Sequence, residues 1–253
     1  MNHSLKAGCI VARKSYNKDI IFIIDKIIKS HNYEKIAIIK GINVRIIADS
    51  PLSDLVLVEK KLQDTEIRFN RSYMQSNAVI LHLDGDRRYS EKSARYYKRF
   101  GLKAIVKNVP EYKQSSMVRG LLEHYSPDIL VITGHDAMFK NNSERNNIYN
   151  YRNSKYFINT VREARNWASS SEELVIFAGA CQSFFEGLMD AGADFASSPD
   201  RILIDFIEPI IVAQKVALTD VKKYISIGDI ASYLTNGTRG IGGSIVRGKK
   251  TPT

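Results

Sequence analysis

The 253-residue sequence contains little cysteine and no long apolar run. Its two cysteines, Cys9 and Cys181, lie far apart and match neither a zinc-ligand spacing nor a CxxC pair, which argues against a disulfide scaffold or a cysteine-based metal site. Thiols this sparse are typical of a reducing compartment. No apolar run approaches the roughly 18 residues of a membrane-spanning helix. The opening MNHSLKAGC lacks the apolar core of a signal peptide, so we expect a protein that is made and folded in the cytoplasm.

Acidic residues are fewer than basic ones: 27 Asp and Glu against 37 Lys and Arg give a formal charge of +10. This sign favours acidic partners such as nucleic acid, anionic surfaces or acidic proteins, although an ordinary basic surface gives the same charge. The cations are spread along the chain. Their one local concentration comes after Asp229, where no acidic residue follows and the cations are Arg239, Arg247, Lys249 and Lys250.

Residues 1–60 predict a small β-barrel domain of the SH3 or OB kind. Short segments rich in Ile and Val are separated there by turn signals such as Gly41 and Asp49-Ser50-Pro51. Barrels of this size bind nucleic acid or peptides in different proteins, so the fold alone does not choose a ligand. Cys9 lies in this pattern without a partner histidine and is interpreted as structural. The polar residues 61–76 predict a linker.

From residue 77 to 235, apolar strand patterns alternate with helical ones, which predicts βαβ units and a parallel sheet covered by helices. The clearest strands are AVILHL, LKAIVK, DILVIT and ELVIFA, with ADFASS as a fifth. Ser183 and Glu186 have capping-box spacing, so a helix is expected from Phe184 to Gly192. Residues 236–253 are rich in Gly and basic residues and predict a loop-like or weakly ordered tail. The fold class is therefore α/β, preceded by the small barrel.

Two of these strands end in residues that suit nucleophilic chemistry. His135 follows the strand in ILVITG, and Cys181 follows the strand in LVIFAGA. Reactive groups collect beyond the carboxyl ends of strands in open parallel sheets. If the two strands are neighbours, the imidazole faces the thiol, which needs such a base to be a nucleophile at neutral pH. The backbone N–H groups of Cys181 and Asp136 are the candidates for an oxyanion hole.

Each residue alone has a more ordinary interpretation. A cysteine after a strand is usually a small buried apolar residue, and a single histidine there is more often part of a turn or the core. The pair is more specific, because 46 positions separate His135 from Cys181 and the caspase signature has an Ala-Cys nucleophile with its histidine about 50 residues upstream. The match is partial, since Asp136 follows the histidine where caspases have Gly. Asp136 can orient the site, face substrate or form a turn.

Seven segments spread over nearly the whole chain carry a family resemblance: VARKSYNKDIIF, LHLDGD, ITGHD, NSKYF, VIFAGACQS, AGADFASSP and GTRGIGG. Together they resemble the YabG family of sporulation-specific proteases from endospore-forming bacteria. The resemblance implies a caspase-like cysteine endopeptidase that processes spore-coat and other sporulation proteins, cuts mainly after Arg or Lys, and processes itself. It places the protein in the mother-cell cytoplasm at the assembling coat. His135 and Cys181 match the family's catalytic pair.

A pocket for a substrate arginine needs a carboxylate, because a guanidinium pairs with it through two hydrogen bonds. The sequence does not rank the candidates, which are Asp84, Asp86, Asp136, Asp205 and Glu208. A helix cap and turn explain Asp84 and Asp86 equally well. Arg145 and Arg152, in the polar loop 140–153, are candidate self-cleavage points, since proteolysis concentrates in loops.

Two other functions stay open. An amidotransferase-like cysteine hydrolase usually has its nucleophile before its histidine, on an elbow with glycine on both sides. Here the histidine comes first, and Ser183 stands where the second glycine would be. The other alternative is a non-catalytic protein that binds nucleic acid or an anionic surface through the barrel and basic tail, with steep salt dependence. For the peptidase we expect protein substrates and no metal or organic cofactor.

Overall fold

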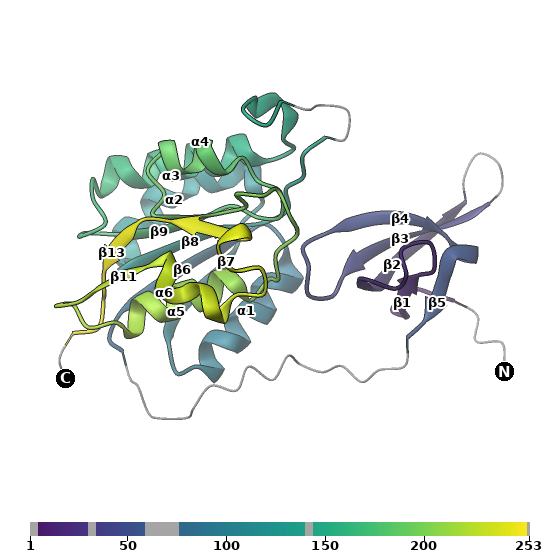
Figure 1. Ribbon diagram of the computed structural model, residues 1–253, viewed down its shortest axis with the longest axis horizontal. Helices are drawn as coiled ribbons and strands as arrows, with labels where there is room; N and C mark the ends of the chain where they lie inside the picture. The colour runs from purple at the N-terminus through teal and green to yellow at the C-terminus, as the bar shows by residue number, and fades with distance from the viewer. Residues whose placement is uncertain (1–4, 30–33, 59–75, 140–143, 252–253) are drawn as a thin grey trace. The chain divides into compact units, whose positions relative to one another are not determined.

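The computed structural model describes residues 5–29, 34–58, 76–139 and 144–251, and the chain divides into two compact units, Met1–Ser72 and Tyr73–Thr253 (Figure 1). Of the predicted linker, 61–76, only Ser76 falls within the described residues. No helix in these ranges is both long and apolar enough to cross a membrane. Each unit has its own apolar core.

The first unit is a five-stranded antiparallel sheet with the strand order β4-β3-β2-β1-β5. Its elements are β1 (Ile10–Arg13), β2 (Ile21–Lys29), β3 (Lys35–Gly41), β4 (Ile47–Pro51), the 3-10 turn η1 (Leu52–Asp54) and β5 (Leu55–Leu57). Alternating side chains turn one face of the strands into a core formed by Val11, Phe22, Ile24, Ala37, Ile39 and Leu55. An antiparallel sheet is thus present, and its kinship with SH3 or OB barrels stays a prediction.

The second unit is built on a six-stranded sheet with the order β12-β10-β9-β8-β6-β7. Its parallel strands are β6 (Val79–Asp84), β7 (Lys103–Asn108), β8 (Ile129–Thr133), β9 (Val175–Ala178) and β10 (Phe195–Ser197), and β12 (Ile241–Gly243) pairs antiparallel with β10. Every residue of β8, β9 and β10 is buried, as expected for strands covered on both faces. The predicted α/β class with a mainly parallel sheet is confirmed.

Helices cover both faces of this sheet. Figure 1 shows α2 (Glu111–Tyr125), α3 (Ser154–Trp167) and α4 (Phe185–Asp190) on one face, and α1 (Arg87–Arg99), α5 (Glu208–Leu218) and the short α6 (Ile227–Ile230) on the other. The 3-10 turns are η2 (Ile148–Asn150), η3 (Ala231–Tyr233) and η4 (Gly237–Arg239). The layers are therefore helix, sheet and helix.

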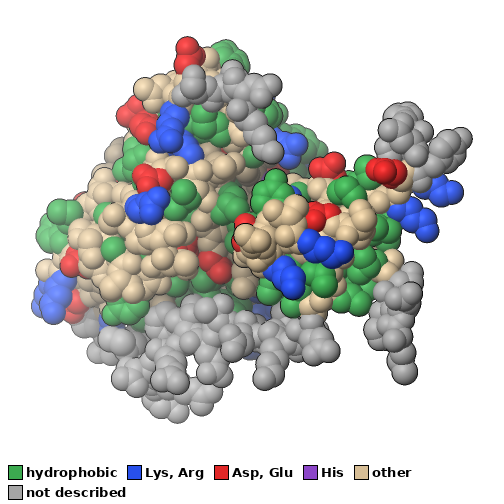
Figure 2. Space-filling model, turned by 45° about the vertical axis from the view of Figure 1, so that its right-hand side comes forward, with side chains coloured by type: hydrophobic (Ala, Val, Ile, Leu, Met, Phe, Trp, Pro, Cys, Tyr) green, Lys and Arg blue, Asp and Glu red, His purple; other side chains and the backbone are tan. Residues whose placement is uncertain are grey.

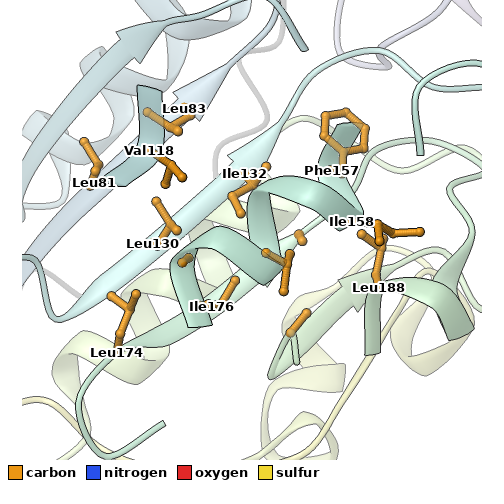
Figure 3. Packing of buried hydrophobic residues seen from close by; sticks show 14 of the residues in the cluster. Leu81, Leu83, Val118, Leu130, Ile132, Phe157, Ile158, Leu174, Ile176 and Leu188 are labelled. Carbon is orange, nitrogen blue, oxygen red and sulfur yellow. The ribbon is translucent and has the colours of Figure 1, made fainter. Parts of the chain in front are cut away.

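One apolar core of the second unit lies between the sheet and the α2–α4 layer. Figure 3 shows strand side chains meeting helix side chains there, among them Leu83, Leu130, Ile132, Val118, Phe157 and Leu188. Each fully buried side chain of this size contributes about 1.5–3 kcal/mol relative to an exposed one. The strand ends that carry the candidate site therefore rest on rigid support.

The prediction of a loop-like or weakly ordered tail at residues 236–253 is wrong for residues 236–251, and the last two residues lie outside the described ranges. This segment contains β12 and also β13 (Ile245–Arg247), which pairs with β11 (Tyr224–Ser226). A Cβ added at Gly243 would lie 2.3 Å from Cδ1 of Phe195, so β12 approaches β10 closely only because it carries glycine. A strand with so few side chains has no apolar alternation to reveal it in the sequence.

Basic side chains do not form one continuous patch on the face of the molecule seen in Figure 2. Lys and Arg appear there in small groups, several of them beside Asp or Glu. On this face, therefore, the basic side chains are spread out.

Candidate active site

The strands that lead to His135 and Cys181 are neighbours in the sheet. β8 and β9 pair in parallel from Ile129 opposite Val175 to Ile132 opposite Ala178. Both residues follow within three positions of their strand's carboxyl end, at one edge of the sheet. The adjacency on which the predicted pair depends is therefore present.

His135 is held by carboxylates on its ring and on its backbone. Nε2 lies 2.9 Å from Oδ2 of Asp86, and the backbone N–H donates to Oε1 of Glu111 at 2.7 Å. The carbonyl oxygen of His135 accepts a hydrogen bond from the side chain of Asn153 at 2.7 Å. Both the ring and the chain at this position are consequently fixed.

Asp86 uses its two carboxylate oxygens for different tasks. Oδ1 caps α1 by accepting the backbone N–H groups of Arg88 and Tyr89 at 2.8 and 3.3 Å, and Oδ2 faces His135. Burial raises the pKa of this carboxyl, but the hydrogen bond and charge of His135 and the capping N–H groups outweigh burial and lower the pKa to about 2. Asp86 is therefore ionised at neutral pH and orients the imidazole.

Two glycines make room for Glu111 beside the histidine. Gly85 and Gly134 each follow a strand directly, and a Cβ on them would lie 2.2 and 2.4 Å from Oε1 of Glu111. The carboxylate thus lies over the ends of β6 and β8. Sequence reasoning missed Glu111, because it lies 24 positions before His135 at the start of another helix. The paired glycines after strands were the available signal.

Asp136 connects the histidine segment with the cysteine segment. Its buried carboxylate accepts hydrogen bonds from the backbone N–H groups of Ala137 and Asn153 and from the hydroxyl groups of Ser154 and Ser183. Burial outweighs these hydrogen bonds and raises the pKa of Asp136 to about 6. Of the three roles considered from the sequence, this geometry favours the orienting one.

Ser183 does not form the predicted capping box. Its hydroxyl donates to Asp136 at 2.9 Å and accepts the backbone N–H of Ala180 at 2.9 Å. α4 runs from Phe185 to Asp190, with Phe184 as its N-cap and no side-chain cap. The expected helix from Phe184 to Gly192 is therefore shorter, because the serine is recruited by the buried Asp136.

Cys181 follows a tight turn at the end of β9. Gly179 has φ +107°, and a Cβ there would lie 2.8 Å from both Cδ1 of Leu188 and the carbonyl oxygen of Ser197. This glycine serves the turn, because protein atoms fill the space that a side chain would need. Cys181 is 1% exposed. Its thiol donates to the carbonyl oxygen of Ile204 at 3.7 Å, and the N–H of Ile204 donates to Sγ at 3.5 Å.

The sequence matches the family model described as YabG peptidase U57, over residues 6–72 and 59–252. The chain belongs to the YabG peptidase family. It is 38% identical, over 274 residues, to the sporulation-specific protease YabG of Bacillus subtilis (strain 168), an alignment that covers 95% of this chain and 94% of that protein. No solved structure matches it. Membership makes this chain a peptidase with protein substrates.

The five carboxylates considered for an arginine pocket differ in how far they are buried. Asp84 is 0% exposed and accepts the N–H of Asp86 and the hydroxyl of Thr133 at 2.9 and 3.1 Å. Glu208 is 1% exposed. Burial raises its pKa to about 7, and the negative charge of Asp205 adds to this effect, whereas the hydrogen bonds that Glu208 accepts oppose it. Asp136 and Asp86 are engaged as described above. Asp205 is partly exposed.

The two candidate self-cleavage residues and the second cysteine lie outside the group of residues described above. In this YabG-family chain the side chains of Arg145 and Arg152 are exposed, and the N–H of Arg152 donates to the carbonyl oxygen of Ala137 at 3.0 Å. Cys9 packs against the core of the first unit. Across the described ranges, no three His, Cys, Asp or Glu side chains form a metal-holding group.

Proposed function

We propose that this YabG-family peptidase is a cysteine endopeptidase with Cys181 as nucleophile and His135 as its base. The observation that carries the proposal is the parallel pairing of β8 with β9, which brings both residues to one sheet edge. The order of histidine before cysteine on neighbouring parallel strands supports a caspase-like arrangement.

The reaction follows from the residue types. The thiol proton of Cys181 passes to Nδ1 of His135, because Nε2 is engaged by Asp86, and Sγ attacks the scissile carbonyl carbon. The imidazolium then protonates the leaving amine, and a thioester remains on Cys181. Water attacks the thioester while His135 accepts a proton, which releases the acid and restores the thiol.

Other groups hold this geometry. Asp86 stabilises the imidazolium, Glu111 and Asn153 fix the histidine backbone, and Asp136 keeps the two catalytic segments in register. The N–H of Ile204 stabilises the thiolate, because a hydrogen bond to the charged form favours it. The proposed oxyanion hole consists of the backbone N–H groups of Cys181 and Asp136.

We further infer that the substrates are spore-coat and other sporulation proteins, cut mainly after Arg or Lys, in the mother-cell cytoplasm. The B. subtilis relative's description as a sporulation-specific protease supports the sporulation role. Self-processing is proposed at Arg145 or Arg152, whose exposure supports it.

The proposal is tested by the cleavage of fluorogenic peptides that contain Arg or Lys. Cys181→Ala and His135→Ala should abolish cleavage without unfolding the protein. Cys9→Ala and His124→Ala are the matched controls and should retain cleavage, because both lie in other parts of the chain. Activity that survives in Cys181→Ala would refute the proposed nucleophile.

A further inference from the structure

Asp205 directly follows the residue that contacts the thiol. The N–H and carbonyl oxygen of Ile204 lie 3.5 and 3.7 Å from Sγ of Cys181. Consecutive Cα atoms are about 3.8 Å apart, so the Cα atom of Asp205 lies about that far from the Cα atom of the residue that hydrogen-bonds to the sulfur.

The residue after Asp205 leads to the histidine. The ring centroids of Phe206 and Tyr89 lie 5.9 Å apart, and the ring centroids of Tyr89 and His135 lie 6.1 Å apart. The two chain neighbours of Asp205 are thus connected to the thiol and to the imidazole. In a peptidase, the substrate residue whose carbonyl is attacked must lie in this neighbourhood.

The local structure fixes the direction of the Asp205 side chain. Its Oδ1 accepts the N–H of Ile207 at 3.1 Å, and its own N–H donates to Oε2 of Glu208 at 3.0 Å. Glu208 is itself held by the N–H of Thr235 at 2.9 Å. The turn therefore presents a partly exposed carboxylate that is backed by a buried one.

The electrostatics of this turn suit a cation. The negative charge of Asp205 acts on Glu208, so a positive side chain at Asp205 relieves the repulsion between the two carboxyl groups. The neighbouring ring of Phe206 already has the ammonium of Lys92 over its face, 3.8 Å from the centroid. Arg and Lys are the substrate side chains with this charge.

We propose that Asp205 is the carboxylate that determines specificity, selecting Arg or Lys at the substrate residue whose carbonyl Cys181 attacks. The inference rests on the proposed Cys181–His135 function and assigns its specificity to one of five sequence candidates. Asp84, Asp136 and Glu208 are buried, and the oxygens of Asp86 serve His135 and α1.

The test compares two peptide series that differ only in arginine or citrulline at the cleavage position. Citrulline keeps the shape of arginine and removes its charge. Asp205→Asn removes the carboxylate charge, and its Oδ1 still accepts the N–H of Ile207. Asp200→Asn is the matched control, because Asp200 is an exposed carboxylate five positions earlier in the chain that pairs with Arg239.

Wild-type protein and Asp200→Asn should prefer arginine in kcat/KM. Asp205→Asn should lose about 10- to 100-fold on arginine and little on citrulline, because a hydrogen bond to a charged group is lost. Equal losses on both peptides, or an unchanged preference in Asp205→Asn, would overturn the inference.

A second readout needs no turnover. Peptidyl chloromethyl ketones ending in arginine or citrulline lose chloride when the thiolate of Cys181 forms a thioether, and mass spectrometry locates the label. Faster labelling by the arginine reagent that disappears in Asp205→Asn supports the inference. Labelling of Cys181 without an arginine preference overturns the role of Asp205 and leaves the proposed nucleophile in place. Peptide cleavage that persists in Cys181→Ala overturns the proposed function.

Discussion

Replacement of Asp86 by Asn separates orientation of the histidine from helix capping. Oδ1 of Asp86 accepts two backbone N–H groups of α1, so an asparagine keeps its oxygen there and turns its amide nitrogen toward Nε2 of His135. Asn caps helices as well as Asp does, so the capping contribution to the free energy of unfolding should change by less than about 1 kcal/mol.

Catalysis should respond far more strongly. An amide N–H that donates to Nε2 holds the proton of His135 on Nδ1, the nitrogen that accepts the thiol proton in the proposed mechanism. Loss of the charged hydrogen bond alone costs about 1.5–3 kcal/mol in the transition state, and the wrong tautomer adds to it. We expect kcat to fall by about 100-fold or more.

The assay is peptide cleavage at saturating substrate, alongside thermal unfolding of the same preparations. Asp86→Ala is the companion variant, and it should lose activity and also about 0.5–2 kcal/mol of stability with the cap. An Asp86→Asn protein with kcat within threefold of wild type would refute the reasoning about the tautomer.

Three further predictions follow from the same contacts. Ser183→Ala should cost about 1–3 kcal/mol in urea unfolding, because the buried N–H of Ala180 loses its acceptor; an unchanged midpoint would contradict the network. Gly134→Ala should lower cleavage much more than Gly120→Ala, since only the former meets Glu111, and equal activity would show that the fit is loose. Burial raises the pKa of Glu208 from 4.5 to about 7, so folding loses about 3 kcal/mol as pH rises through this range, and Glu208→Gln should flatten the stability profile between pH 5 and pH 8.

The parallel sheet was predictable because its strands are continuous apolar runs. A strand buried on both faces carries this signal locally, as in β8 and β9. β12 was missed, because its packing against Phe195 depends on the absence of side chains. Glycine in a strand and glycine in a loop look alike in a sequence.

The candidate site was predictable only in part. His135 and Cys181 stand out since each directly follows a short Gly-containing turn after a strand. The roles of Asp86 and Glu111 depend on side chains that cross from one strand end to another, 49 and 24 positions away from the histidine. Asp136 was visible, but its partner Ser183 suggested a helix cap until burial of both groups explained their hydrogen bond.

The most direct test of the account is to trap the proposed thioester. A peptide ester that acylates rapidly is mixed with the protein, quenched in acid and digested, and the mass of each cysteine-containing peptide is measured. The account predicts the acyl group on Cys181, its absence from Cys9, and no acylation in His135→Ala. Turnover of the ester without an acyl group on Cys181 would contradict it.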